Sequence, residues 1–186
     1  MSTASAHIEC DKTETVAGRE LMMSPPGISH INIQMNLGGI IWQFLKGKRC
    51  KVFSEAMLVL DGANRFIPDL MIVCDRKKIK AKYIDGVPDF VAEILSPSTR
   101  QIDIGTKKDT YEKFGVKEYW VIDPMSQTVD VYLLHNKRYV LDKSCHNYSP
   151  EDWDELTDKE KETAQLTLKI SLYDDLIIDI KEIFAV

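Results

Sequence analysis

The chain has 186 residues, of which 44% are hydrophobic and 28% are charged, and its formal net charge at pH 7 is −5. These values are ordinary for a soluble globular protein, and the length fits one domain spanning residues 1–186. The first twenty residues carry charges instead of an apolar signal core, and no apolar run reaches membrane-spanning length. We therefore expect a cytoplasmic protein with no membrane segment.

The cysteines exclude two further classes of protein. Cys10, Cys50, Cys74 and Cys145 lie far apart, with no CxxC pair and no cluster with histidine. This spacing favours neither a zinc site nor a disulfide framework. We expect four free thiols.

The negative charge is unevenly distributed along the chain. Residues 151–186 contain 11 acids and 4 bases, which leaves 18 acids and 20 bases in residues 1–150. Within residues 46–82, ten basic residues stand against four acids. A run that includes Arg76, Lys77 and Lys78 is expected either to bind nucleic-acid phosphates or simply to form a solvated face.

Taken in chain order, the first half predicts a helix followed by three strands. Residues 1–20 form a polar N-terminal segment, and a turn at 24–27 follows. Ser29 is expected to cap a helix that ends near Lys46, because apolar residues recur at spacings of three and four. Apolar runs over 51–60, 66–74 and 87–95 predict strands, and Pro97 closes the third of them.

The second half predicts a helix, two strands and a peripheral insertion. Asp103 is a predicted N-cap for a helix over 104–114, and Gly115 fits its C-terminal stop. Strands are expected over 118–122 and 128–134, a short acidic helix over about 150–162 within a peripheral insertion at about 145–165, and an apolar end that packs on the core. This order indicates an α/β (α+β) domain with a mixed sheet flanked by helices.

Two carboxylates stand out because they fall inside apolar strands. If strands 66–74 and 87–95 form a hairpin symmetric about residue 81, Asp69 faces Glu93 directly, on the same side of the sheet. A cation between them would offset their repulsion, and hard oxygen ligands at that separation suit Mg²⁺, with Mn²⁺ as an alternative. Either acid alone has the structural alternative of a salt bridge with a nearby base.

Several segments closely resemble the Uma-two family of restriction endonucleases, almost from end to end. The segments that carry the resemblance are Pro68-Asp69, the stretch from Val91 to Thr99, Asp103 through Lys107 to Tyr111, and the stretch from Gly115 to Pro124. That family belongs to the PD-(D/E)XK nucleases. The resemblance implies a core of a helix, a three-stranded meander, a helix and a further strand.

The resemblance also implies the roles of the site residues. Asp69 and Glu93 match the two acids of the motif, whereas the lysine normally found two residues after the second acid is replaced by Leu95. Lys107 is the expected replacement, with Tyr111 one turn later on the same helix face. The supporting residues that the resemblance or the pattern places near the site are Glu14 as a third metal acid, His30, Gln34 and Ser96.

The resulting functional expectation is a magnesium-dependent DNA endonuclease, and cleavage of both strands would favour a homodimer. The missing strand lysine leaves a second class open, a nucleic-acid-binding or interaction protein that has lost efficient catalysis. A different phosphoester substrate on the same scaffold is a third possibility, because fold alone does not determine function.

Overall fold

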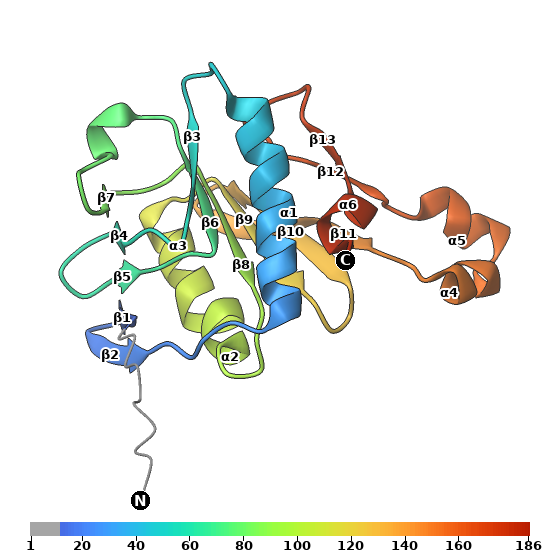
Figure 1. Ribbon diagram of the computed structural model, residues 1–186, viewed down its shortest axis with the longest axis horizontal. Coiled ribbons are helices and arrows are strands. Elements are labelled where there is room, and N and C mark those ends of the chain that lie inside the picture. The colour runs from blue at the N-terminus through green and yellow to red at the C-terminus, as the bar shows by residue number, and fades with distance from the viewer. Residues whose placement is uncertain (1–11) are drawn as a thin grey trace, which may run out of the picture.

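The computed structural model describes residues 12–186, and Figure 1 shows how its elements are arranged. Cys10 lies outside the described residues. The helical elements are α1 Ile28–Leu45, η1 Arg76–Lys78, α2 Arg100–Ile102, η2 Asp103–Lys107, α3 Lys108–Phe114, α4 Pro150–Glu155, α5 Asp158–Thr163 and α6 Ile180–Phe184. The strands are β1 Thr13–Val16, β2 Arg19–Met22, β3 Lys51–Ser54, β4 Leu58–Val59, β5 Arg65–Phe66, β6 Leu70–Val73, β7 Ile84–Asp85, β8 Phe90–Ile94, β9 Glu118–Asp123, β10 Thr128–His135, β11 Arg138–His146, β12 Thr167–Lys169 and β13 Ile177–Asp179.

A six-stranded mixed sheet in the order β11-β10-β9-β8-β6-β3 forms the centre of the protein. Strands β3, β6 and β8 are antiparallel neighbours, and β9 pairs parallel to β8. The parallel step requires a crossover, which the helical segment from Arg100 to Phe114 supplies. The predicted order of helix, three-stranded meander, helix and further strand is confirmed.

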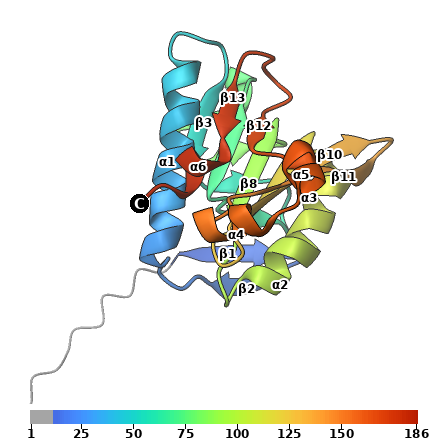
Figure 2. The same cartoon turned by 90° about the vertical axis from the view of Figure 1, so that its right-hand side faces the viewer.

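Both faces of this sheet are covered, so its central strands are buried throughout. Helix α1 lies on one face and α3 on the other, as the turned view in Figure 2 shows. Alternate residues of β6 and β8 therefore enter two separate cores: Ile72 and Ala92 pack on the α1 side, whereas Met71 and Val91 pack on the α3 side. The C-terminal elements β13 and α6 join the α1-side core, as the apolar chain end predicts.

A second, smaller sheet in the order β2-β1-β5-β4-β7 forms beside the first because two predicted strands are interrupted. The predicted strand 51–60 divides into β3 and β4 at Glu55, whose φ of 50° is incompatible with extended pairing. The predicted strand 66–74 divides into β5 and β6 around Pro68, which has no N–H for a ladder. The polar residues 13–22, predicted to be weakly patterned, pair as the β1–β2 hairpin.

Two predicted helix starts are wrong by a few residues. Helix α1 begins after Gly27, and Ser29 lies inside its first turn. Asp103 is not an N-cap, because the helical segment already begins at Arg100 and the Asp103 side chain turns inward to pair with Lys107. In both cases a good capping residue stands one to three positions inside the real start of the helix.

The acidic insertion forms two short helices where one was predicted. Leu156 ends α4, and Thr157 starts α5 with a capping box in which Thr157 and Glu160 satisfy each other's backbone N–H groups. In Figure 1 these two helices project from the body of the protein at the right. Among residues 12–186, no helix is long and apolar enough to cross a membrane.

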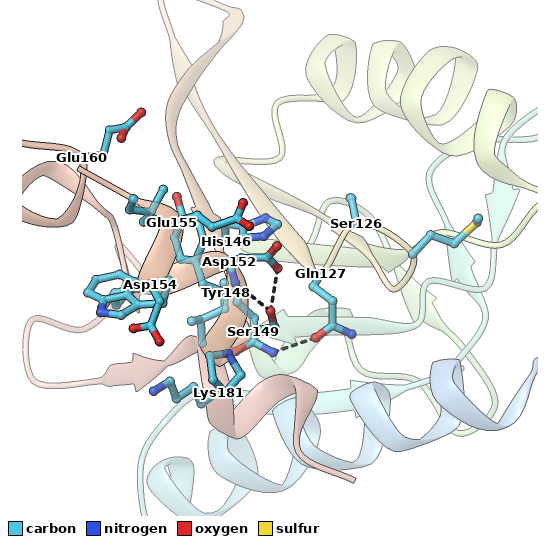
Figure 3. Close-up of a pocket in the computed structure, with 17 residues that line it drawn as sticks. Ser126, Gln127, His146, Tyr148, Ser149, Asp152, Asp154, Glu155, Glu160 and Lys181 are labelled. Carbon is cyan, nitrogen blue, oxygen red and sulfur yellow. Dashed lines mark hydrogen bonds between the residues drawn. The ribbon is translucent and has the colours of Figure 1, made fainter.

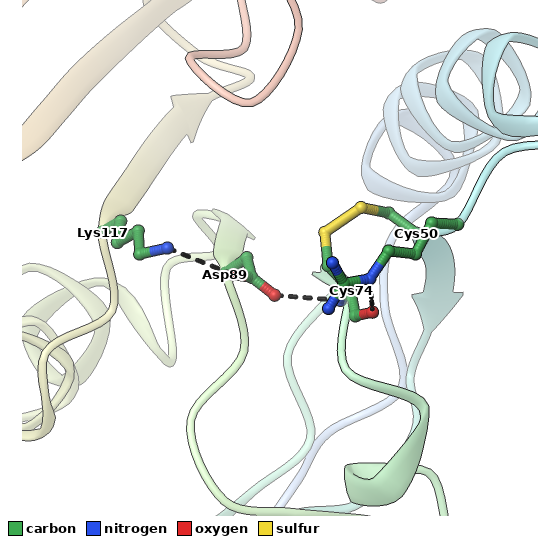
Figure 4. The surroundings of a disulfide bond; sticks show 5 residues. Cys50, Cys74, Asp89 and Lys117 are labelled. Atoms are coloured by element: carbon green, nitrogen blue, oxygen red, sulfur yellow. Dashed lines mark hydrogen bonds and ion pairs between the residues drawn. A yellow bond between two sulfur atoms is a disulfide. The ribbon is translucent and has the colours of Figure 1, made fainter.

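The expectation of free thiols is wrong for two of the cysteines. Cys50 and Cys74 form a disulfide, which Figure 4 shows beside Asp89 and Lys117. The register of β3 and β6 pairs Lys51 with Val73. The next residues along the two strands, Cys50 and Cys74, therefore lie opposite each other. Cys145 is buried and free.

Candidate functional site

The two carboxylates predicted to form a pair lie directly opposite each other at one end of β6 and β8. Leu70 pairs with Ala92 and Met71 with Val91, so the register is symmetric about residue 81 and brings Asp69 opposite Glu93. The backbone N–H of Asp69 donates to Glu93 Oε2 at 3.4 Å. Both side chains belong to the α3 face of the sheet. The predicted register is therefore confirmed.

The helical segment above this face brings Lys107 into contact with Glu93. Its ammonium group lies 2.9 Å from Glu14 Oε1, 3.2 Å from Glu93 Oε1 and 3.3 Å from Asp103 Oδ1. Only 1% of Lys107 is exposed, so it is among the largest fully buried side chains of the protein. Three acids around one buried lysine form a compact charge cluster, which we call the lysine cluster (Glu14, Glu93, Asp103, Lys107).

Burial dominates the electrostatics of the lysine cluster. Desolvation raises the pKa of Glu93 well above its usual value, although the nearby Lys107 charge acts in the opposite direction. Desolvation also raises the pKa values of Glu14 and Asp103, again against the effect of Lys107. Desolvation alone would lower the pKa of Lys107, but its acidic neighbours outweigh this effect and raise it. The lysine is therefore protonated at neutral pH, and its charge is the main effect that opposes the desolvation of the three acids.

A tyrosine from the same helix completes the contacts of Glu93. The hydroxyl of Tyr111 donates to Glu93 Oε1 at 2.8 Å, on the oxygen that Lys107 also approaches. The π-helical turn Asp103–Lys107 precedes α3. The side chains at its two ends, Asp103 and Lys107, both belong to the lysine cluster. The neighbouring Lys108 points away from the site, with its ammonium group 3.4 Å from the centre of the Tyr132 ring.

Helix α1 supplies the contacts that hold Asp69. His30 Nε2 lies 2.9 Å from Asp69 Oδ1, and the backbone N–H of Ile94 donates to Asp69 Oδ2 at 2.6 Å. Gln34 donates to the backbone carbonyl of Asp69 at 3.1 Å and to Ser54 Oγ at 2.8 Å. Burial lowers the pKa of His30, but the hydrogen bond and charge of Asp69 outweigh it, so this pKa is raised overall. Both predicted supporting residues of α1 thus contact the site.

A cavity of about 260 Å³ opens onto these groups. Asp69, Glu93, Asp103 and Lys107 form its floor, His30 lies at one side, and the turn from Ser96 to Thr99 forms another wall. Ser96 Oγ lies 2.9 Å from Thr99 Oγ1 and 3.0 Å from Ser98 Oγ, so its hydroxyl is engaged within the turn. The segment Met23–Gly27 also lines the cavity.

Glu14 and the three predicted nucleic-acid-binding residues Arg76, Lys77 and Lys78 do not line the cavity. Glu14 Oε1 accepts both from Lys107 and from the backbone N–H of Ile67 at 2.6 Å. The basic run Arg76–Lys78 forms η1 after the C-terminal end of β6, whereas Asp69 precedes the other end of that strand. The structure therefore separates this run from the carboxylates.

Asp103 is the site residue that sequence reasoning missed. The sequence does contain a signal for it, since Asp103 and Lys107 are four positions apart, the spacing of a helical ion pair. Asp103 is 2% exposed, and its backbone carbonyl accepts from the Tyr119 hydroxyl at 2.9 Å.

The oxygen donors of the site suit a divalent metal ion that keeps part of its water shell. Among residues 12–186, no three His, Cys, Asp or Glu side chains are arranged as a closed metal cage. Mg²⁺ does not need one, because it keeps several waters and takes one or two protein carboxylates together with substrate phosphate oxygens. Asp69 and Glu93 line the cavity and offer these oxygens, so the residues present fit Mg²⁺.

A second concavity, of about 1410 Å³, lies between the α4–α5 helices and the body of the protein. As Figure 3 shows, its labelled side chains include Asp152, Asp154 and Glu155 of α4 and Tyr148, together with Lys181 of α6. The three acids are exposed, and they make no contact with the lysine cluster. This concavity therefore belongs to the surface of the insertion.

The fold and the site together define a protein with the restriction-endonuclease-like α/β core. A solved structure from Anabaena variabilis, described as a "putative nuclease belonging to DUF820", superposes with a TM-score of 0.70 at 23% identity, covering 93% of this chain and 89% of that one. A family model described as "Uma2: Putative restriction endonuclease" matches residues 9–168. The chain belongs to this family.

A curated relative adds a more distant similarity. An uncharacterized protein of Synechocystis sp. is 26% identical over 125 residues, which is 66% of this chain and 66% of the relative. The chain thus matches slightly less than two thirds of that relative's length.

Proposed function

We propose that this protein is a magnesium-dependent endonuclease that hydrolyses phosphodiester bonds in DNA. The observation that carries the proposal is the Asp69–Glu93 pair, held opposite each other at the floor of a cavity, with Lys107 3.2 Å from Glu93. Like charges in such proximity favour a divalent cation, and phosphate-ester hydrolysis is the chemistry that this combination serves.

Asp69 and Glu93 would hold the Mg²⁺ ion. When bound, such an ion polarises the phosphate and lowers the pKa of a coordinated water. The protein's own groups then have positioning tasks. His30 and the backbone N–H of Ile94 orient the two oxygens of Asp69, and Tyr111 orients Glu93.

Lys107 is proposed to have two roles. Its charge opposes the desolvation that raises the pKa of Glu93. Its ammonium group lies within 3.3 Å of three carboxylates, and Asp103 Oδ1 accepts no hydrogen bond from it. Asp103, at 3.3 Å, is the most distant of the three and is the partner we expect a phosphate oxygen to replace. A donor placed there would stabilise negative charge that grows in the transition state.

The test is cleavage of plasmid and oligonucleotide DNA by the purified protein with Mg²⁺, Mn²⁺ or EDTA. Asp69→Asn and Glu93→Gln should each lower the rate by roughly a hundredfold or more, because each removes a charged metal ligand. Asp85→Asn, which changes an exposed carboxylate of β7 away from the cavity, is the matched control and should cleave like the parent protein. Circular dichroism of every variant checks that it is folded.

Metal binding provides a second readout that does not depend on turnover. Mg²⁺ at one hundred times its dissociation constant should stabilise the parent protein by about 2.7 kcal/mol, and Asp69→Asn should lose this gain. If no nucleic acid is cleaved and neither variant changes metal binding, the proposal fails, and the alternative of an inactive nucleic-acid-binding or interaction protein replaces it.

A further inference from the structure

The depth of the proposed site limits the shape of the substrate. Glu93 is 2% exposed and Lys107 is 1% exposed, whereas the side chain of Asp69 retains 15% exposure and that of His30 12%. A phosphate must therefore enter the cavity to meet Glu93, because no part of the lysine cluster reaches the outer surface. A cavity of about 260 Å³ is also smaller than the usual range of about 300–1,000 Å³ for ligand pockets.

Two segments that contain proline line the cavity, and proline restricts the backbone. One wall is the segment Met23–Gly27, which contains two consecutive prolines and which we call the proline strap. The backbone N–H of Met23 donates to Lys12 at 2.9 Å, and Lys12 forms an ion pair with Glu55, so the strap is tied at its start. A second wall is the Ser96–Thr99 turn, closed by its own hydroxyl contacts and stiffened by Pro97.

The charges around the cavity do not suit a double helix. The acids that line it are Glu55, Asp69, Glu93 and Asp103, and its lysines are Lys12 and Lys107, both of which are already paired with acids. The next base along this wall, Arg100, is paired with Asp123 at 2.5 Å. Binding to a duplex draws much of its affinity from Lys and Arg contacts with phosphates, and η1, the basic run, lies at the other end of β6.

We infer that the substrate is single-stranded DNA, whose flexible backbone enters between the proline strap and the Ser96–Thr99 turn with one phosphodiester at a time. This inference rests on the proposed nuclease function. A single strand can bend into a narrow cavity, whereas a base pair would have to be opened at an energetic cost before a duplex phosphate could follow. Cleavage of one strand also needs no two-fold partner, so the reaction does not require the homodimer expected from duplex cleavage.

The experiment compares end-labelled oligonucleotides of one sequence in three forms: single strand, perfect duplex, and duplex with a central unpaired bubble. With Mg²⁺ or Mn²⁺, the single strand and the bubble should be cut at least tenfold faster than the perfect duplex, with cuts confined to unpaired positions. Equal or faster cutting of the perfect duplex would overturn the inference while leaving the nuclease function intact. Cleavage of none of the three would count against the nuclease function itself.

A measurement of DNA binding tests the inference independently of DNA cleavage. Fluorescence anisotropy in Ca²⁺ should show tighter binding of the single strand than of the duplex, with a salt dependence of about three phosphates or fewer. Tighter duplex binding with a steep salt dependence would refute the inference even if the protein proved inactive.

A variant of the proline strap tests the proposed cause. Pro25→Gly/Pro26→Gly loosens one wall without touching a carboxylate, so it should raise the duplex-to-single-strand rate ratio at least threefold. Pro150→Gly, in the distant helix α4, is the matched control and should leave the ratio unchanged. An unchanged ratio in the strap variant would show that the walls do not select the substrate.

Discussion

Replacement of Lys107 by methionine tests whether this lysine is the counter-charge of the site. Methionine retains the unbranched apolar stem but removes the ammonium group, which lies 2.9–3.3 Å from three carboxylates. Loss of one member of a buried ion pair leaves an uncompensated charge and typically costs about 3–5 kcal/mol. For a protein of this size, that loss lowers the melting temperature by roughly 6–20 °C.

The pH dependence of this loss distinguishes an electrostatic cause from a packing defect. Without Lys107, the effect that lowers the pKa values of Glu14, Glu93 and Asp103 disappears, so these values rise further above their ordinary 4.5, 4.5 and 3.8. The folded variant then binds more protons than the unfolded chain above those ordinary values. Its stability falls as pH rises through the raised pKa values, so the deficit should be larger at about pH 8 than at about pH 5.

The assay is thermal unfolding of the parent protein and the variant at both pH values, followed by circular dichroism. Lys108→Met is the control, because Lys108 is the neighbouring lysine and contacts the Tyr132 ring instead of an acid. This control should cost about 1 kcal/mol at either pH. A Lys107→Met protein that is as stable as the parent at pH 8, or whose deficit is larger at pH 5, would refute the counter-charge argument.

Two further predictions concern single contacts of the fold and site. Tyr111→Phe keeps the buried ring but removes the hydrogen-bond donor to Glu93 Oε1. Urea unfolding should show that the free energy of unfolding falls by about 1–3 kcal/mol. A decrease below about 0.5 kcal/mol would show that this hydrogen bond is unimportant. Reduction of the Cys50–Cys74 disulfide, which spans a sequence separation of 24, should lower stability by about 3 kcal/mol, and a Cys50→Ser/Cys74→Ser variant should melt at one temperature with or without reductant. A parent protein indifferent to reductant would contradict the bond.

The sequence was most informative where hydrophobic pattern and symmetry acted together. The apolar runs around Asp69 and Glu93 are separated by one loop of about a dozen residues, so a symmetric hairpin predicts their register without further information. The prediction for Cys50 and Cys74 was wrong because it considered only the spacing of the cysteines along the sequence. The pairing of β3 with β6 is symmetric about Gly62, and this register brings the two cysteines opposite each other.

The missed elements have few buried apolar residues of their own. Strand β11 is an edge strand whose residues are mostly exposed, so its sequence lacks the alternation that identifies a half-buried strand. Asp103 was misread for a different reason. Aspartate is among the best N-cap residues, and only tertiary structure reveals that its carboxylate is needed inside, beside Lys107.

The π-helical turn Asp103–Lys107 makes the length of this segment as important as its composition. Each residue of an ordinary α-helix advances by 100°, so deletion of one residue from the turn would rotate Asp103 and everything before it relative to Tyr111. The exposed members of the turn, Ile104 and Thr106, are free to vary in side chain. The number of residues in this turn is therefore more constrained than the side chains at its exposed positions. Point substitutions at these two positions are tolerated, whereas deletion of one residue disrupts the site.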